Sequence, residues 1–283
     1  MDVQNILLGE IANLKLPFVS YPFLDKVRAL IKNQFPEGDP ERISSQIDYK
    51  DLVFRLDQIR NVLYSEPQIN SLFLPIINFL NLDPNFLYMD FIRIRCVPHN
   101  FHLNPGSESV SYLHRDCWYA NPQCQLNLWI PLSDIKLGSG FTIYPDYFHK
   151  PIKNNSSFFD YNHWLETGGF QAKPNPRFSE KIFPTVLEPV VRKNILHVFG
   201  GYGSMFLFSS HHLHGTENNT MGYSRFSLEI RFILKSWIED FSGPKNLDNE
   251  SKGTTLFSMR KFNTYEILPE NIIQNFAIAS AFH

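Results

Sequence analysis

Cysteine is scarce in this sequence. Among 283 residues there are three cysteines, Cys96, Cys117 and Cys124, and no two of them form a C-x-x-C pair. An odd number of cysteines with this spacing fits neither a disulfide framework nor a zinc knuckle. The low count favours a reducing compartment, and we expect a cytoplasmic protein.

An excess of one charge and long apolar runs are also missing. Lysine and arginine number 26 against 28 aspartate and glutamate residues, a net charge of -2, whereas nucleic-acid binding draws on an excess of cations. No apolar run reaches the roughly 20 residues that span a bilayer. The start of the chain, where Asp2 and Glu10 flank a short apolar patch, differs from a secretory signal. We therefore expect neither a nucleic-acid nor a membrane partner.

Apolar and aromatic residues are plentiful. Hydrophobic residues make up 43% of the chain and charged residues 19%, and 26 residues are phenylalanine. A chain of this length and composition can bury a large core, and a β-rich single domain commonly reaches this size. We expect one domain over residues 1–283.

The first third of the chain has a helical pattern. Between residues 21 and 84 the apolar residues recur at intervals of three and four, as at Leu52 and Leu56, which is the period of a helix with one buried face. A further helix is expected over about residues 67–80. Residues 1–85 are predicted to form a mainly helical layer.

The period then changes to that of β-strands. Apolar and polar residues alternate within residues 89–97, 123–132 and 225–233, so each strand has one apolar and one polar face. The polar faces have two explanations, contact with water on one side of an antiparallel sheet or lining of a barrel lumen. The alternation alone does not distinguish between these two explanations, although the N-terminal helices are available to cover the apolar side from outside.

Two later segments lack the strand pattern. Residues 150–202 contain many loop-forming residues, and we expect a lid-like insertion there. Residues 242–255 are polar and rich in turn-forming residues. They predict an exposed excursion within a C-terminal extension over residues 236–283.

The stretch SYLHRDCWY contains a candidate metal-binding pair. His114 and Asp116 are two residues apart, so they project from the same side of an extended segment. Far along the chain lie His211, His212 and His214, and any of them would complete a set of two histidines and one carboxylate. Such a set leaves three positions of an octahedron open, which suits Fe(II) with a chelating cosubstrate and dioxygen. The tripeptide alone is a weak signal, because a histidine beside a carboxylate is more often a structural hydrogen bond.

The segment from about Phe91 to Phe232 resembles the Fe(II)/2-oxoglutarate-dependent oxygenases, in particular their phytanoyl-CoA-dioxygenase-like branch. The residues that match the motifs of this family, in chain order, are His114-Arg115-Asp116, Trp129 to Asp134, Gly138 to Gly140, Pro145, His149-Lys150, Gly203, His214-Gly215-Thr216, Asn219 and Arg225. The resemblance implies a β-rich α+β fold. It would be a double-stranded β-helix (a jelly roll, cupin-like) over residues 86–235, with the N-terminal helices packed on the outer face of the sheet.

The resemblance also implies which residues bind the metal. His114 and Asp116 would be two ligands of Fe(II), and the match to the family motif selects His214 as the third, with His212 as the second choice. The presence of Asp116 argues against the related halogenases, in which halide takes the position of the missing carboxylate. Phe148 and the long insertion depart from the family pattern, and they leave the substrate class open.

Cosubstrate binding is expected to involve the polar faces of two strands. The resemblance implies that Arg225 holds the distal carboxylate of 2-oxoglutarate, a role that suits a planar guanidinium, and Ser227 on the same face would add a hydroxyl. Without the histidine motif, Arg225 would be interpreted as a surface arginine. Gln125 and Asn127 are candidate cofactor-binding residues, with a solvated polar face as the alternative.

Aromatic and charged residues near the proposed ligands have less specific interpretations. Tyr112, Trp118 and Tyr119 flank the ligands and are candidates for a substrate pocket, with core packing as the alternative. A structural charge network inside the lumen is expected from Arg93, Arg95, Glu229 and Arg231.

Together, the motif and the resemblance predict an Fe(II)- and 2-oxoglutarate-dependent dioxygenase. Such an enzyme uses O2 and hydroxylates a small-molecule metabolite with release of succinate and CO2. One alternative is a metal-dependent cupin that isomerises or hydrolyses its substrate with the same histidines. Another is a non-catalytic jelly-roll module that binds a ligand, in which the three metal-ligand residues have no metal.

Overall fold

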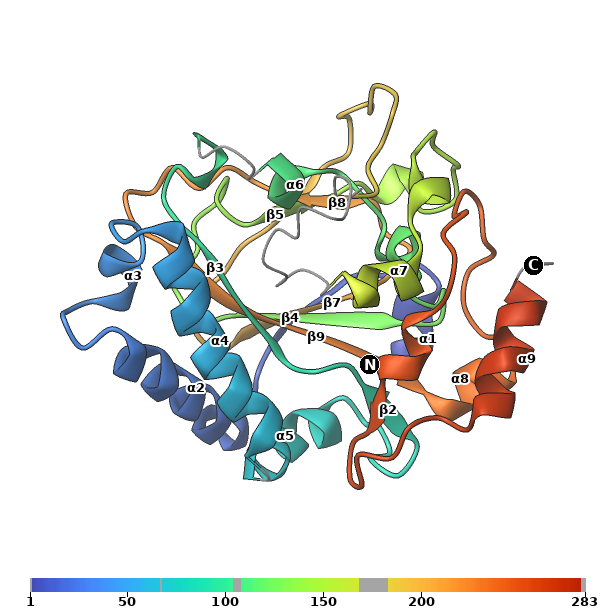
Figure 1. The fold of residues 1–283 in the computed structure, drawn as a ribbon, viewed down its shortest axis with the longest axis horizontal. Coiled ribbons are helices and arrows are strands. Elements are labelled where there is room, and N and C mark those ends of the chain that lie inside the picture. Colours follow the sequence, from blue (N-terminus) through green and yellow to red (C-terminus); the bar gives the residue numbers. More distant parts are fainter. Residues whose placement is uncertain (1, 67, 104–107, 168–182, 281–283) are drawn as a thin grey trace.

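The structure, a computed structural model, describes residues 2–66, 68–103, 108–167 and 183–280 (Figure 1). Two antiparallel sheets form its centre, and helices lie against the outer side of the larger sheet. No helix in the described part of the chain combines the length and the apolar character that crossing a membrane requires.

The N-terminal helices cover the larger sheet from outside (Figure 1). The three long ones are α2 (Tyr21–Gln34), α4 (Tyr49–Ser65) and α5 (Gln68–Phe79). Their buried residues, such as Leu24 and Leu52, join one hydrophobic core with the apolar residues of the sheet. The helical pattern of this region is therefore confirmed. Two short helices, α1 (Val3–Leu7) and α3 (Pro40–Ile43), complete the set.

The larger sheet contains the three predicted strand segments. Of residues 89–97, predicted as one strand, Arg93–Val97 form a strand, and Met89 ends a separate short strand that begins at Leu87; both strands pair antiparallel with β9. The N-terminal region adds an edge strand that the helical prediction missed, because only four residues alternate there. The strands in spatial order are β1 (Ala12–Lys15), β7 (Ser204–Ser209), β4 (Leu126–Pro131), β9 (Arg225–Leu234), β2 (Leu87–Met89) and β10 (Arg260–Lys261), while β3 (Arg93–Val97) also pairs with β9.

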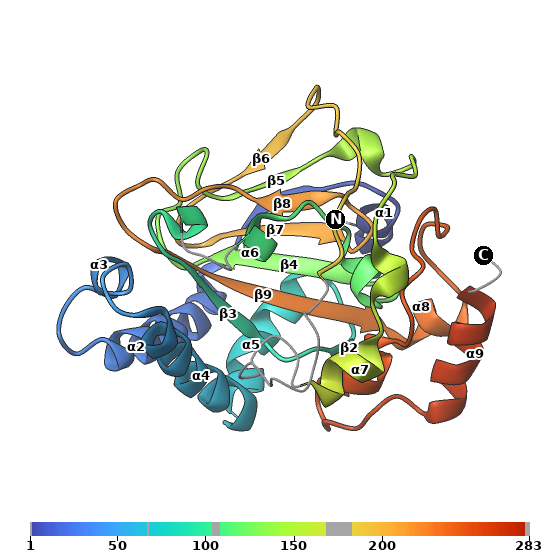
Figure 2. The same cartoon turned by 45° about the horizontal axis from the view of Figure 1, so that its top comes forward.

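The smaller sheet faces the larger one (Figure 2), and residues of both sheets line one cavity. It has the order β6-β5-β8, with β6 (Leu196–Val198), β5 (Phe141–Ile143) and β8 (His214–Thr216). Polar faces of β4 and β9 line the cavity, and the apolar faces of the same strands pack on the helices. The lumen is thus the correct explanation for the polar face, and the β-rich α+β fold is confirmed.

The remaining elements belong to the insertion and to the C-terminal extension. The described part of the insertion includes α7 (Tyr161–Glu166) and β6, and residues 168–182 of the predicted lid lie outside the described residues. Three other helices are α6 (Glu108–Ser111), α8 (Lys235–Glu239) and α9 (Glu270–Ser280).

The segment over residues 242–255 is not the exposed excursion that its composition predicted. The side chain of Asp248 is only 6% exposed and forms an ion pair with the fully buried Arg115, with 3.2 Å between Oδ2 and Nε. Its other oxygen accepts a hydrogen bond of 2.8 Å from the indole nitrogen of Trp118. Turn-forming composition revealed the loop, but it gave no sign of this buried partner 133 residues away.

Candidate functional site

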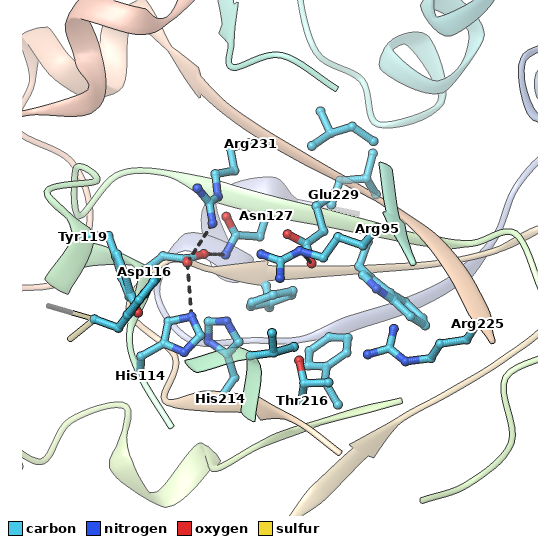
Figure 3. Close-up of a pocket in the computed structure, with 17 residues that line it drawn as sticks. Arg95, His114, Asp116, Tyr119, Asn127, His214, Thr216, Arg225, Glu229 and Arg231 are labelled. Atoms are coloured by element: carbon cyan, nitrogen blue, oxygen red, sulfur yellow. Dashed lines mark hydrogen bonds and ion pairs between the residues drawn. The ribbon is translucent and has the colours of Figure 1, made fainter. Parts of the chain in front are cut away.

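Three side chains far apart in the sequence meet at one end of the cavity (Figure 3). His114 and His214 form an isolated antiparallel bridge, in which each backbone N–H donates to the carbonyl of the other residue at 2.9 Å. Asp116 begins the short 3-10 helix Asp116–Tyr119 that follows. One ligand atom from each of the three residues lies within 4.8 Å of the other two.

Backbone contacts orient both imidazole rings. Nδ1 of His114 lies 2.8 Å from the carbonyl oxygen of Tyr112, and Nδ1 of His214 lies 2.9 Å from that of His212. A carbonyl oxygen only accepts hydrogen bonds, so in each ring Nδ1 carries a proton. Burial lowers the pKa of His214 to about 4, which keeps this ring neutral at physiological pH.

The carboxylate of Asp116 is held through both of its oxygens. Oδ1 accepts a hydrogen bond of 3.0 Å from the guanidinium of Arg231, and Oδ2 accepts one of 2.5 Å from the amide of Asn127. Gln125 donates in turn to the amide oxygen of Asn127 at 2.9 Å. Burial favours the neutral acid, but Arg231 and His114 outweigh it and hold the pKa of Asp116 well below its usual range. The carboxylate is therefore ionised.

This arrangement matches the donor set of a mononuclear metal site. Two neutral imidazole nitrogens and one carboxylate oxygen suit Fe(II) and leave part of the coordination sphere open. The protons on Nδ1 and the hydrogen bonds to Asp116 are the outer contacts that usually orient such ligands. Among the described residues, this is the one cluster of three or more such side chains that could hold a metal ion. The residues present therefore fit a bound metal.

The cavity has a volume of about 130 Å³ and extends between the two sheets. The three candidate ligands lie at one end and Arg225 at the other (Figure 3). Arg225 is 3% exposed, and its Nη2 donates to the carbonyl oxygen of Gly140 at 3.1 Å. Burial lowers its pKa to about 10, so it remains a cation. Its Nε is buried and has no hydrogen-bond partner among the described residues.

Other predicted residues lie at different distances from the cavity. Asn127 lines it, whereas Gln125 lies behind Asn127 and Ser227 is buried beside the lining without contributing to it. Tyr119 lines the cavity, with its ring edge toward His114 at 5.2 Å between centroids. Tyr112 does not line it and contributes its backbone carbonyl.

Two predicted or alternative residues point elsewhere. Trp118 does not line the cavity; it is fully buried in a separate apolar cluster, where Cys117 also packs as a small hydrophobic residue. His212, the second choice for the metal, lies with Nε2 at 3.2 Å from the carbonyl oxygen of Gly9. Its ring is therefore outside the group formed by His114, Asp116 and His214.

Three of the four charged residues predicted to form a structural network inside the lumen line the cavity. Arg231 contacts Asp116, and Arg95 and Glu229 form an ion pair with 2.6 Å between Nε and Oε1. Arg93 pairs instead with Asp90 and does not line the cavity. Alternation along β9 was a usable signal, because Glu229 and Arg231 share the face of Arg225.

Comparisons with known proteins show the fold alone. A scan of protein-family models finds no match, and a search of curated proteins finds no similar chain. Among solved structures, EvdO2 from Micromonospora carbonacea var. aurantiaca in complex with 2-oxoglutarate is 14% identical, with a TM-score of 0.50 over 82% of this chain and 89% of that chain. This likeness confirms the jelly-roll fold.

Two further solved structures match with lower TM-scores. The non-heme monooxygenase ThoJ is 10% identical, with a TM-score of 0.44 over 99% of this chain and 95% of its own. The epimerase SnoN, solved with Fe3+, alpha ketoglutarate and nogalamycin RO, is 12% identical, with a TM-score of 0.40 over 82% of each chain. The phytanoyl-CoA-dioxygenase-like branch stays a prediction, since no family model matches.

Proposed function

We propose that the protein is an Fe(II)- and 2-oxoglutarate-dependent dioxygenase that hydroxylates a small-molecule metabolite. The observation that carries the proposal is the convergence of His114, Asp116 and His214 in one cavity with the buried guanidinium of Arg225. A cupin isomerase or hydrolase would use the same metal ligands but has no need of Arg225. A non-catalytic binding module needs neither group.

His114, Asp116 and His214 would hold the iron. Because Nδ1 of each ring is hydrogen-bonded to a backbone carbonyl, Nε2 would be the metal-binding atom of each histidine, and the ionised carboxylate supports Asp116 as the third ligand. Arg231 and Asn127 would keep Asp116 in one orientation, because each of them donates to a different carboxylate oxygen.

Arg225 would bind the distal carboxylate of 2-oxoglutarate. A buried donor without an acceptor is costly, so the unpartnered Nε supports a ligand with acceptor oxygens at this end of the cavity. The hydroxyl of Thr216 lines the same region. Ser227 follows on the same face of β9, and its buried hydroxyl also has no partner among the described residues.

Bound Fe(II) with 2-oxoglutarate and dioxygen supplies the oxidising chemistry, in which R–H, O2 and 2-oxoglutarate give R–OH, succinate and CO2. The chain orients the reactants and excludes water. Trp129, Phe141 and Phe208 belong to one buried apolar cluster and line the cavity. Such a wall limits competing reactions with water.

We further propose that residues 1–283 work as one oxygenase domain of the phytanoyl-CoA-dioxygenase-like branch. Residues 86–235 would carry the site, residues 1–85 would form its outer helical layer, and residues 236–283 would brace it through Asp248. Phe183 in the insertion lines the cavity, which supports a role of the insertion in enclosing the substrate.

Arg225→Ala is expected to weaken the binding of 2-oxoglutarate by about 10- to 100-fold, because hydrogen bonds to a charged group contribute about 1.5–3 kcal/mol. Anaerobic titration of the Fe(II)-loaded protein with 2-oxoglutarate measures this through the weak visible charge-transfer band of the chelate. Arg225→Lys keeps the charge without the planar fork. We expect its affinity for 2-oxoglutarate to lie between those of the wild type and Arg225→Ala.

Arg93→Ala is the matched control, since Arg93 lies on the neighbouring strand and does not line the cavity. We expect it to bind 2-oxoglutarate like the wild type. If the wild-type protein gives no charge-transfer band, or if Arg225→Ala gives the same titration curve, the oxygenase proposal is wrong and a cupin isomerase or a binding module becomes the better explanation.

A further inference from the structure

The side chains that line the cavity carry one positive charge in excess. Three guanidinium groups line it, those of Arg95, Arg225 and Arg231, against two carboxylates, those of Asp116 and Glu229. The two lining histidines would be neutral as metal ligands, and no lysine is among the described residues that line the cavity. A buried charge without a counterion is costly, so this excess favours a ligand with negative charge.

The proposed cofactors leave this excess unchanged. A divalent metal adds two positive charges, and 2-oxoglutarate, as a dianion, adds two negative charges. Arg225 would be neutralised by the distal carboxylate. Asp116 is shared, because the same carboxylate would bind the metal and accept a hydrogen bond from Arg231 at 3.0 Å. One carboxylate cannot neutralise both the metal and Arg231. The excess positive charge is therefore assigned to Arg231.

Arg95 lies beside this excess positive charge, and its guanidinium has hydrogen-bond donors that its ion pair does not use. Its side chain is 37% exposed, against 11% for Arg231, so Arg95 is nearer the opening of the cavity. Its ion pair with Glu229 is formed through Nε, and within the described part of the chain its two terminal nitrogens have no hydrogen-bond partner. Figure 3 shows its guanidinium extending from β3 over the cavity toward the candidate metal ligands.

We propose that the substrate is a small molecule with a single carboxylate, which Arg95 and Arg231 bind together. One carboxylate balances the one excess charge, and its planar oxygens match the guanidinium fork. A cation would be repelled, and a neutral molecule would leave Arg231 uncompensated. The rest of the substrate would contact Tyr119 and Phe183, the aromatic residues of the cavity that lie outside the Trp129 cluster. This inference rests on the proposed function.

A matched panel of ligands tests the inference. The probes are alkyl and aryl monocarboxylates, acetate and benzoate included, each paired with its primary amide of the same skeleton. Each is titrated anaerobically into protein loaded with Fe(II) and saturated with 2-oxoglutarate, and binding is followed as a change in the visible band. Succinate release after admission of oxygen provides a second readout. We expect carboxylates to bind at least about tenfold more tightly than their amides.

Arg95→Gln is expected to weaken carboxylate binding by about tenfold or more and to leave amide binding unchanged. Arg95→Lys is expected to recover part of the loss. The matched control is Arg93→Gln, since Arg93 is on the same strand and is also ion-paired, but it does not line the cavity. That variant should behave like the wild type.

The outcomes separate this inference from the proposed function. If the band with 2-oxoglutarate does not form, the oxygenase proposal fails before any substrate is added. If the band forms but acids and amides bind equally, no acid of the panel binds, or Arg95→Gln and Arg93→Gln have the same effect, the carboxylate inference is overturned while the oxygenase proposal stands.

Discussion

Asp116→Ala is expected to abolish turnover of 2-oxoglutarate, with a loss of more than about 100-fold, since removal of even an outer contact to a metal ligand costs 10- to 100-fold. The variant lacks the carboxylate that is proposed to bind the metal. It also leaves Arg231, 11% exposed, without its carboxylate partner, and Asn127 without its acceptor. Succinate release from the iron-supplemented variant measures the effect.

A conservative variant and a surface control test whether the charge of Asp116 is required. Asp116→Asn keeps the shape and an acceptor oxygen, and we expect it to remain at least about tenfold below the wild type. Asp134→Ala removes a carboxylate that is 66% exposed and serves as the control, with activity equal to that of the wild type. Wild-type succinate release from Asp116→Ala would rule out a metal centre at this position.

Arg115→Met is expected to lower the free energy of unfolding by about 3–5 kcal/mol, the range for breaking a buried ion pair from one side. Arg115 is the middle residue of the H-x-D motif, and its side chain is fully buried. It donates to Asp248, to the carbonyl oxygens of Tyr147 and Lys150 at 2.7 Å, and to that of His211. Urea denaturation monitored by circular dichroism measures the change.

Asp248→Asn in the Arg115→Met background is expected to recover part of the loss, because the carboxylate that lost its cation is then neutral. Lys136→Met is the control. Lys136 is 62% exposed and pairs with an exposed aspartate, and surface pairs contribute little. If Arg115→Met were as stable as this control, the buried pair would not be what holds the metal-binding motif against the C-terminal extension.

Local patterns predicted two of the strands that line the candidate site. The alternation of apolar and polar residues predicted β4 and β9, because each strand is long enough to show this pattern and has one face in the core. The H-x-D spacing and the resemblance together led to His114, Asp116 and His214, which the fold brings together. The residue pattern alone did not decide which of His211, His212 and His214 would be the third metal ligand.

Contacts between distant segments could not be predicted from local patterns. β1 has four residues and is held by its pairing with β7, and Asp248 lies in a turn-rich segment whose composition gave no sign of Arg115. The strand predicted over residues 89–97 is interrupted between Met89, where β2 ends, and Arg93, where β3 begins, and the two strands pair with different parts of β9.

Anaerobic titration with Fe(II) tests the shared metal centre most directly. We predict that the wild-type protein and His212→Ala each bind one Fe(II) per chain, whereas His114→Ala and His214→Ala retain no stoichiometric iron. Circular dichroism verifies that each variant is folded. Failure of the wild-type protein to bind iron, or equal binding by His214→Ala and His212→Ala, would contradict a centre built from His114, Asp116 and His214.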